Sequence, residues 1–291
     1  MTSDRVRLGE FDVYGLRDGF FYLDGGAMFG VVPKTLWEKK CPADARNRIK
    51  LALNSLLIRT PGAIVLVETG IGSKLGSKLS DVYCVEQDPG LLGSLGRLGF
   101  APEEVDFVIN THLHFDHCGG NTVRNEKGEI VPAFPRARYI IQKGEWEWAL
   151  NPHEREKGSY QAENFRPLAD YGLLQLVDGG SQVTAGIEVM LAPGHTARHQ
   201  CVKVKSGGKT LVYLGDLVPT SAHIALAYGM SYDLHPLENL ESKRTLYEQA
   251  LAEDWTLAFV HDPGHYFGKV RKLNRKYEFQ PEYSDKGLLK E

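Results

Sequence analysis

Long apolar runs are missing from this sequence. No stretch approaches the roughly 18 consecutive apolar residues that a membrane-spanning helix needs. Residues 1–20 also lack the apolar run that is typical of a signal peptide. We therefore expect a soluble, cytoplasmic protein with no membrane partner.

Cysteine is scarce, with four residues in a chain of 291 and no CxxC pair. This spacing indicates neither a disulfide framework nor a thiolate zinc knuckle. We expect reduced thiols with structural roles at Cys41, Cys84, Cys118 and Cys201. Cys118 adjoins a histidine-rich motif, but we expect its thiol to pack in the interior.

An excess of one charge is also absent. The formal net charge is −3, and acidic and basic residues are interspersed along the chain. Such a chain has no electrostatic field for gathering phosphate backbones, which argues against nucleic acid as the main partner. A small-molecule substrate fits better.

Linkers and low-complexity segments are absent too, and a hydrophobic content of 42% is enough for a substantial core. We therefore predict one domain over residues 1–291, in which short β-like runs alternate with helical patterns. The sequence TPG at 60–62 predicts a hairpin turn between two strands. Residues 24–40, DGGAMFGVVPKTLWEKK, are too long for a tight connection and suggest a functional loop.

A repeated order of elements links the two halves of the chain. In each half an apolar run ends at an acid, a helical pattern follows, and a second apolar run ends at a histidine. Glu68 precedes His112 by 44 residues, and Asp216 precedes His261 by 45. Side chains just beyond the carboxyl ends of such strands tend to converge on a crevice. We expect both halves to contribute to one cleft.

The most informative stretch is THLHFDH at 111–117, which places His112, His114, Asp116 and His117 within six positions. Imidazole and carboxylate ligands suit zinc and its neighbours in the first transition row. On a regular strand His117 would point away from the other three, so a loop or a first helical turn must intervene. The glycines at 119–120 supply conformational freedom for that turn. The alternative is a solvated histidine-rich loop, which the preceding apolar strand disfavours.

Four ligands are too many for one open catalytic ion, since such sites typically use three protein ligands. We therefore predict two divalent transition-metal ions, with zinc the best match. The remaining candidate ligands are His195, Asp216 and His261, each beside a glycine or at a strand end. The two oxygens of Asp216 suit a bridge between two cations.

The ordered set HLHFDH, GH, GD and a late histidine resembles the metallo-β-lactamase superfamily over nearly the whole chain. The segments GGAMFGVVPKTLW, LGDLVPTSAH and HDPGH resemble the branch that contains quorum-quenching N-acyl-homoserine lactonases, with methyl parathion hydrolase more distant. The resemblance implies an α/β fold, an αββα sandwich of two mixed sheets flanked by helices. It also implies the ligand sets: one ion held by His112, His114 and His195, the other by Asp116, His117 and His261, with Asp216 shared.

This resemblance implies a metal-dependent hydrolase that opens a lactone or carboxylic ester, with an N-acyl-homoserine lactone as the favoured substrate, through a metal-bridging hydroxide. Asp116 and Asp216 are the candidate catalytic groups for proton transfer. Hydrolysis of a phosphotriester or aryl ester is the main alternative. Redox chemistry at a di-iron site is disfavoured, because relatives of that type carry an acid where His114 stands and need a flavin domain. A non-enzymatic binding protein is disfavoured because all seven ligand positions are filled.

The chain departs from the family pattern at several positions. ETG replaces the frequent DTG, so we expect Glu68 to orient a ligand histidine by a hydrogen bond that fixes its tautomer. Arg198 stands where glycine is usual, and His199 is expected to support the site without binding metal. No tyrosine follows Asp216 closely, so either Thr220 or His223 takes that role or the role is absent.

Substrate contacts are predicted from apolar residues near the metal motif. Met28 and Phe29 lie between glycines, and Phe115 lies within the motif itself. We predict that these three residues, together with His223, contact the substrate. Packing in the core is the alternative for the apolar three. The sequence is also compatible with a homodimer.

Overall fold

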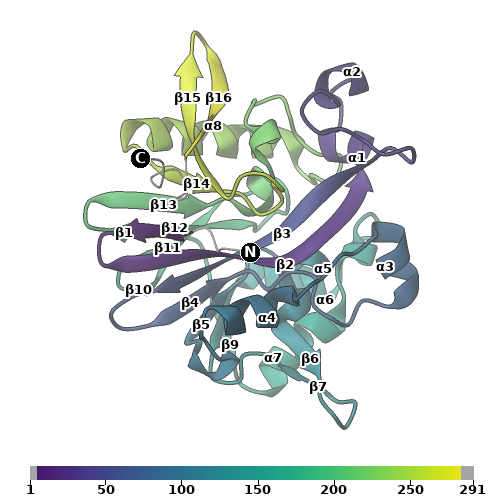
Figure 1. Ribbon diagram of the computed structural model, residues 1–291, viewed down its shortest axis with the longest axis vertical. Coiled ribbons are helices and arrows are strands. Elements are labelled where there is room, and N and C mark those ends of the chain that lie inside the picture. The colour runs from purple at the N-terminus through teal and green to yellow at the C-terminus, as the bar shows by residue number, and fades with distance from the viewer. Residues whose placement is uncertain (1–4, 283–291) are drawn as a thin grey trace.

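The computed structural model describes residues 5–282, and its framework is a pair of seven-stranded β-sheets. The first sheet has the strand order β1-β2-β3-β4-β5-β8-β9 (Figure 1). Its strands are β1 (Arg5–Leu8), β2 (Phe11–Asp24), β3 (Arg48–Arg59), β4 (Ile64–Val67), β5 (Phe107–Ile109), β8 (Arg138–Gln142) and β9 (Leu174–Val177). A separate hairpin joins β6 (Thr122–Arg124) to β7 (Ile130–Pro132).

The second sheet follows the chain order, from β10 to β16. Its strands are β10 (Ser181–Thr184), β11 (Ile187–Leu191), β12 (Gln200–Ser206), β13 (Lys209–Tyr213), β14 (Thr256–Ala258), β15 (Phe267–Leu273) and β16 (Lys276–Pro281). Both sheets contain a parallel pair, β4 with β5 and β13 with β14. This confirms the predicted internal repeat, because each pair carries the acid and the histidine at its carboxyl ends.

Alternating side chains bury both faces of each sheet. On β4, Val65 and Val67 join a buried cluster that also contains Val202 and Tyr213 of the second sheet. Leu66, between them, joins a different cluster on the outer face. The period of two along the strand therefore fills both the layer between the sheets and the layer under the helices.

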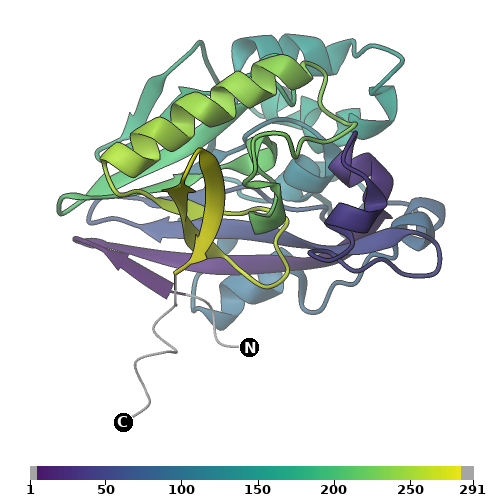
Figure 2. The ribbon, with the colours of Figure 1, turned by 90° about the horizontal axis from the view of Figure 1, so that it is seen from above.

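Helices cover the two outer faces, which confirms the αββα sandwich (Figures 1 and 2). The first sheet packs against α4 (Gly90–Arg97), α6 (Lys143–Leu150) and α7 (Arg166–Asp170) through buried residues such as Leu95 and Leu168. The second packs against α8 (Pro236–Ala252) through Leu246 and Tyr247. The shorter helices are α1 (Gly25–Phe29), α2 (Lys34–Trp37), α3 (Ser77–Tyr83) and α5 (Phe115–Cys118).

Two local predictions have different outcomes. The turn at 60–62 joins β3 to β4 as an antiparallel pair, as predicted. Residues 24–40 are not an open loop, because they form α1 and α2 and bury Trp37. No helix among residues 5–282 is long and apolar enough to cross a membrane.

Candidate metal centre

The candidate ligands lie just beyond the carboxyl ends of strands from both sheets. His112 follows β5, His195 follows β11, and His261 follows β14. Asp216 follows β13, in the 3-10 turn Gly215–Leu217. Gly215 has a φ of 52°, and a Cβ there would lie 2.6 Å from Nε2 of His199, so the turn requires glycine.

The 112–117 motif changes backbone conformation between His114 and Phe115. His114 is extended, with a ψ of 152°, and caps the four-residue helix α5. This is the predicted break that lets His117 turn inward. The two following glycines serve a different purpose from the predicted one, since neither has a positive φ. A Cβ on Gly119 or Gly120 would lie 2.1 or 2.3 Å from the carbonyl oxygens of Ile71 and Thr69, so both allow close backbone approach.

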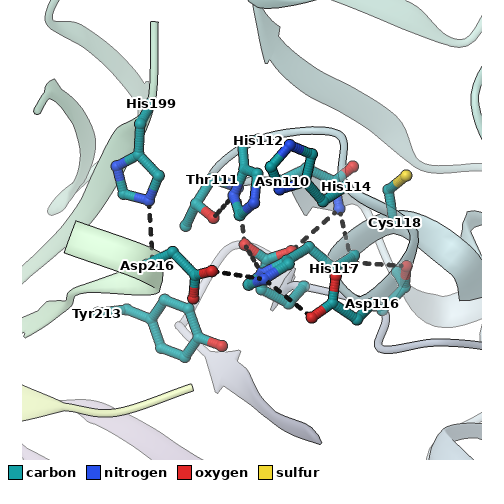
Figure 3. Close-up of polar contacts among 12 residues, drawn as sticks. Asn110, Thr111, His112, His114, Asp116, His117, Cys118, His199, Tyr213 and Asp216 are labelled. Atoms are coloured by element: carbon teal, nitrogen blue, oxygen red, sulfur yellow. Dashed lines mark hydrogen bonds and ion pairs between the residues drawn. The ribbon is translucent and has the colours of Figure 1, made fainter. Parts of the chain in front are cut away.

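Three candidate ligand histidines are held through Nδ1. His112 Nδ1 lies 3.0 Å from the Thr111 hydroxyl oxygen (Figure 3), and His261 Nδ1 lies 2.8 Å from the Ala52 carbonyl oxygen. The third contact joins His195 Nδ1 to the Asp233 carboxylate at 3.1 Å. The Ala52 carbonyl and the Asp233 carboxylate accept the Nδ1 proton, and the Thr111 hydroxyl is able to accept it as well, which leaves Nε2 of each ring available as a ligand atom.

The inward-facing nitrogens and oxygens converge at short distances. His195 Nε2 lies 3.2 Å from His114 Nδ1, and His261 Nε2 lies 3.3 Å from His117 Nε2. The ligand atoms form three sets, and within each set they lie no more than 4.8 Å apart. The sets are His112, His114 and His195; His112, His117 and Asp216; and Asp116, His117 and His261. The structure thus brings together all seven residues that the sequence proposed as ligands.

The two oxygens of Asp216 face different histidines. Its Oδ2 lies 3.3 Å from His195 Nε2 and 3.5 Å from His117 Nε2. Its Oδ1 lies 3.2 Å from His261 Nε2. The carboxylate therefore stands between the two outer ligand sets, with Oδ1 facing His261 and Oδ2 facing both His195 and His117.

The donor set fits divalent cations. All seven side chains are buried, and His112 Nε2 has no hydrogen-bond partner among residues 5–282. Close pairs of imidazole nitrogens are stable only with a proton or a metal ion between them. Nitrogen and carboxylate ligands of this kind suit Zn²⁺.

Burial and neighbouring charges shift the pKa values of the candidate ligands in different directions. Burial alone would lower the pKa of His117, but the carboxylates of Asp216 and Asp116 raise it well above its usual value. Burial would raise the pKa of Asp216, but the histidines around it, His117 foremost, hold it well below the ordinary range. Burial and the neighbouring imidazoles keep the pKa of His112 well below normal. The two acids thus supply negative charge that compensates a buried cation.

Glu68 and His199 lie where supporting groups are expected. Glu68 is buried, accepts a hydrogen bond from the backbone N–H of Thr111 at 2.8 Å, and lies 3.7 Å from His117 Nδ1. That last distance is longer than a hydrogen bond, so the prediction that Glu68 hydrogen-bonds a ligand histidine is wrong for His117, and the contact between them is electrostatic. His199 accepts from the backbone N–H of Asp216 at 3.1 Å (Figure 3), and burial lowers its pKa to about 3.

A cavity of about 390 Å³ opens over the centre. Its size is typical of sites for small molecules. Its lining includes the ligand residues His114, Asp116, His195, Asp216 and His261. The rest of the lining consists of Leu23, Met28, Tyr83, Phe115, Arg155, Glu156, Ser159, Met230, Ser231, Tyr232 and Leu234.

The predicted substrate contacts divide into two groups. Met28 and Phe115 line the cavity, and their contact with a substrate stays a prediction. Phe29 and His223 are not in its lining and are fully buried, so their prediction as direct contacts is wrong. The Phe29 ring stacks between the rings of Trp37 and His223, and its centroid lies 5.3 Å from that of Trp37 and 4.4 Å from that of His223. Apolar character beside glycines could not distinguish a cavity wall from the layer behind it.

Two further sequence hypotheses concern the loops around the ligands. Thr220 Oγ1 lies 2.8 Å from His223 Nδ1, and His223 Nε2 lies 2.8 Å from the Met28 carbonyl oxygen. Neither residue is in the cavity lining. Arg198 is exposed and lies against Gly144, outside the site. Cys118 is buried and its thiol lies 3.3 Å from the Leu113 carbonyl oxygen, which confirms a packed thiol.

Several residues that the sequence did not single out support the centre. Asp233 contacts His195, and Glu145 accepts hydrogen bonds from the Leu113 N–H at 3.0 Å and the Thr196 hydroxyl at 2.7 Å. Both acids are buried. They lie far from the ligands in sequence and in no recognisable motif, so only the folded chain reveals them.

The arrangement agrees with the family to which the chain belongs, the metallo-β-lactamase superfamily, whose model matches residues 50–261. That range contains all seven candidate ligands. Among curated relatives, the N-acyl homoserine lactonase AttM of Rhizobium radiobacter is 25% identical over 71% of this chain and 80% of its own length. The N-acyl homoserine lactonase of Bacillus cereus is 28% identical over 58% of this chain, and the match spans 64% of that enzyme.

A solved structure shares the whole architecture. The crystal structure of a probable metal-dependent hydrolase from Staphylococcus aureus superposes with a TM-score of 0.86 at 29% identity. The alignment covers 96% of this chain and 100% of that one. The fold described above is therefore that of a complete solved relative.

Proposed function

We propose that this protein is a binuclear metal-dependent lactonase that opens the ring of N-acyl-homoserine lactones. His112, His114 and His195 would hold one ion, Asp116, His117 and His261 the other, and Asp216 would contact both. The observation that carries the proposal is the Asp216 carboxylate, whose oxygens lie 3.3 Å from His195 Nε2 and 3.2 Å from His261 Nε2. Zinc is the proposed metal, because the donors are imidazole and carboxylate.

The residues of the chain have separate tasks in this reaction. When bound, the two ions polarise the lactone carbonyl and lower the pKa of water. The five histidines hold the ions in a buried pocket, and Thr111, Asp233 and the Ala52 carbonyl keep three of those rings in orientation. Asp116 and Asp216 line the cavity, where a carboxylate oxygen can take the proton of the attacking water and return it to the leaving alkoxide.

The cavity also fits the acyl chain of such a substrate. Leu23, Met28, Met230 and Leu234 form apolar parts of its wall. Each methylene buried there gains on the order of 0.8 kcal/mol. The activity named for both curated relatives supports the same substrate class.

A substrate panel on zinc-reconstituted protein tests the proposal. We expect ring opening of N-hexanoyl-homoserine lactone, followed as proton release, with kcat/KM at least tenfold above that for a simple alkyl ester. An Asp216→Ala variant should show no ring opening above background. Full metal loading without lactone hydrolysis would refute the proposed activity.

Hydrolysis of an aryl ester or aryl phosphotriester is the second candidate function. It is favoured by the stacked rings of Tyr83 and Phe115 in the cavity wall, whose centroids lie 5.3 Å apart at 22°. A flat aromatic surface of this kind would hold an aryl leaving group. Parallel assays with an aryl phosphotriester and the homoserine lactone separate the two candidates by their kcat/KM ratio.

A further inference from the structure

His114 is oriented differently from the other candidate ligand histidines. It turns Nδ1 towards the centre, where that atom lies 3.2 Å from His195 Nε2. His112, His195 and His261 instead use Nδ1 for an outward contact. The outward atom of His114 is therefore Nε2, and a partner is needed there to fix the tautomer.

The side chain that faces this nitrogen is Glu156. Its Oε2 lies 3.5 Å from His114 Nε2, and the residue is 7% exposed in the cavity wall. Both atoms are buried without a hydrogen-bond partner among residues 5–282. A small rotation of either side chain would form a hydrogen bond between the imidazole N–H and the carboxylate oxygen, and each buried atom would then have a partner.

The surroundings hold both side chains in place. The indole N–H of Trp148 donates to Glu156 Oε1, and the backbone N–H of Glu156 donates to the His153 carbonyl at 3.1 Å. The Tyr160 ring packs edge-on against His114 with centroids 4.8 Å apart. Oε2 of Glu156 therefore stays directed at the imidazole.

We propose that Glu156 is a positioning residue, which accepts the Nε2–H of His114 and so presents Nδ1 as the ligand atom. The inference rests on the proposed metal centre and adds a residue to it. A carboxylate behind a ligand imidazole raises its basicity, and losing such a partner typically lowers metal affinity 10–100-fold. The effect should fall on the ion held by His112, His114 and His195, because the ligand that Glu156 faces is His114.

Zn²⁺ binding measured against a chromophoric chelator tests this role without any substrate. We expect Glu156→Ala to weaken one of two zinc ions per chain by 10–100-fold and to leave the other unchanged. Glu154→Ala is the matched control, because it removes a neighbouring carboxylate whose side chain is 90% exposed and faces His153 instead of a candidate ligand. It should bind both ions as the wild type does.

The isosteric Glu156→Gln variant gives a readout that a merely structural role would not produce. Its single amide oxygen must serve either the Trp148 N–H or the His114 N–H, so its zinc affinity should fall. Adding Trp148→Phe to Glu156→Gln frees the amide oxygen for His114, and the double variant should recover affinity. This variant also decides the matter if Glu156→Ala does not fold.

Wild-type affinity for both ions in Glu156→Ala and Glu156→Gln would overturn the proposal, as would a wild-type protein that binds no zinc. Failure of the proposed function is separate. A protein that binds two zinc ions but leaves the lactone intact would contradict lactonase activity and not the role of Glu156.

Discussion

The Asp233 carboxylate lies 3.1 Å from Nδ1 of His195 and so connects the cavity-lining segment 230–234 to a candidate metal ligand. Its second oxygen accepts a hydrogen bond from the backbone N–H of Met230 at 2.9 Å. The backbone N–H of Leu234 donates to the carbonyl of His195 at 3.1 Å. Residues 230–234 are therefore joined to one proposed ligand by both side-chain and backbone contacts.

Replacing Asp233 should weaken the centre without dismantling the fold. In Asp233→Asn one acceptor oxygen is lost, so either His195 or the Met230 N–H loses its partner. We expect zinc affinity or kcat/KM to fall about 10–100-fold. Chelator competition measures the change, and Asp170→Asn, at the exposed end of α7, is the matched control. Unchanged affinity in Asp233→Asn would show that this contact does not orient His195.

Glu68 should support His117 through charge and Thr111 through its hydrogen bond. Glu68→Gln removes the negative charge 3.7 Å from His117 Nδ1 but keeps an acceptor for the Thr111 N–H. We expect zinc affinity to fall while the melting temperature of the metal-free protein changes little. Equal loss of both quantities would assign Glu68 a purely structural role. Titration of metal-free protein with Zn²⁺, beside thermal melts, distinguishes the outcomes.

Met28 and Phe29 are neighbours with different expected effects. Met28 lines the cavity, so Met28→Ala should flatten the dependence of kcat/KM on acyl-chain length. Phe29 is fully buried, so Phe29→Ala should cost about 3–5 kcal/mol of stability and leave the chain-length profile unchanged. A series of homoserine lactones and a urea melt test both variants. A changed dependence of kcat/KM on acyl-chain length in Phe29→Ala would show that Phe29 does affect substrate binding.

Residues that follow strand ends were predictable from the sequence, and residues in irregular segments were not. His112, Asp216 and His261 end apolar runs, and the carboxyl ends of parallel strands meet at one edge of a sheet. Asp233 and Glu156 lie outside the named helices and strands, where no periodicity fixes the direction of a side chain. Their roles depend on how those segments pack over the sandwich.

A helix of only five residues is also too short for a periodic pattern to show which side chains face the cavity, and this explains the errors around residues 24–40. Met28 and Phe29 are adjacent and apolar in a short helix, yet one lines the cavity and the other stacks on Trp37. The single domain over residues 1–291, the cytoplasmic location and the homodimer stay predictions. Residues 1–4 and 283–291 lie outside the described residues.

Metal removal should lower thermal stability. Without cations, the buried imidazoles and carboxylates lose the ions that compensate their charges and fill their ligand positions. Since an ion that binds only the folded chain stabilises it by about 2.7 kcal/mol at 100 times its Kd, chelation should lower Tm by several degrees. Readdition of Zn²⁺ should restore it. A Tm that does not respond to either treatment would contradict tight binding.

Metal content per chain tests the central claim most directly. Elemental analysis of zinc-reconstituted, gel-filtered protein should give two ions for the wild type and for His153→Ala, whose side chain is 66% exposed and is not a candidate ligand. Asp216→Ala should retain at most one ion, because it removes the carboxylate that faces both His195 and His261. One ion per wild-type chain, or two in Asp216→Ala, would contradict a binuclear centre joined by Asp216.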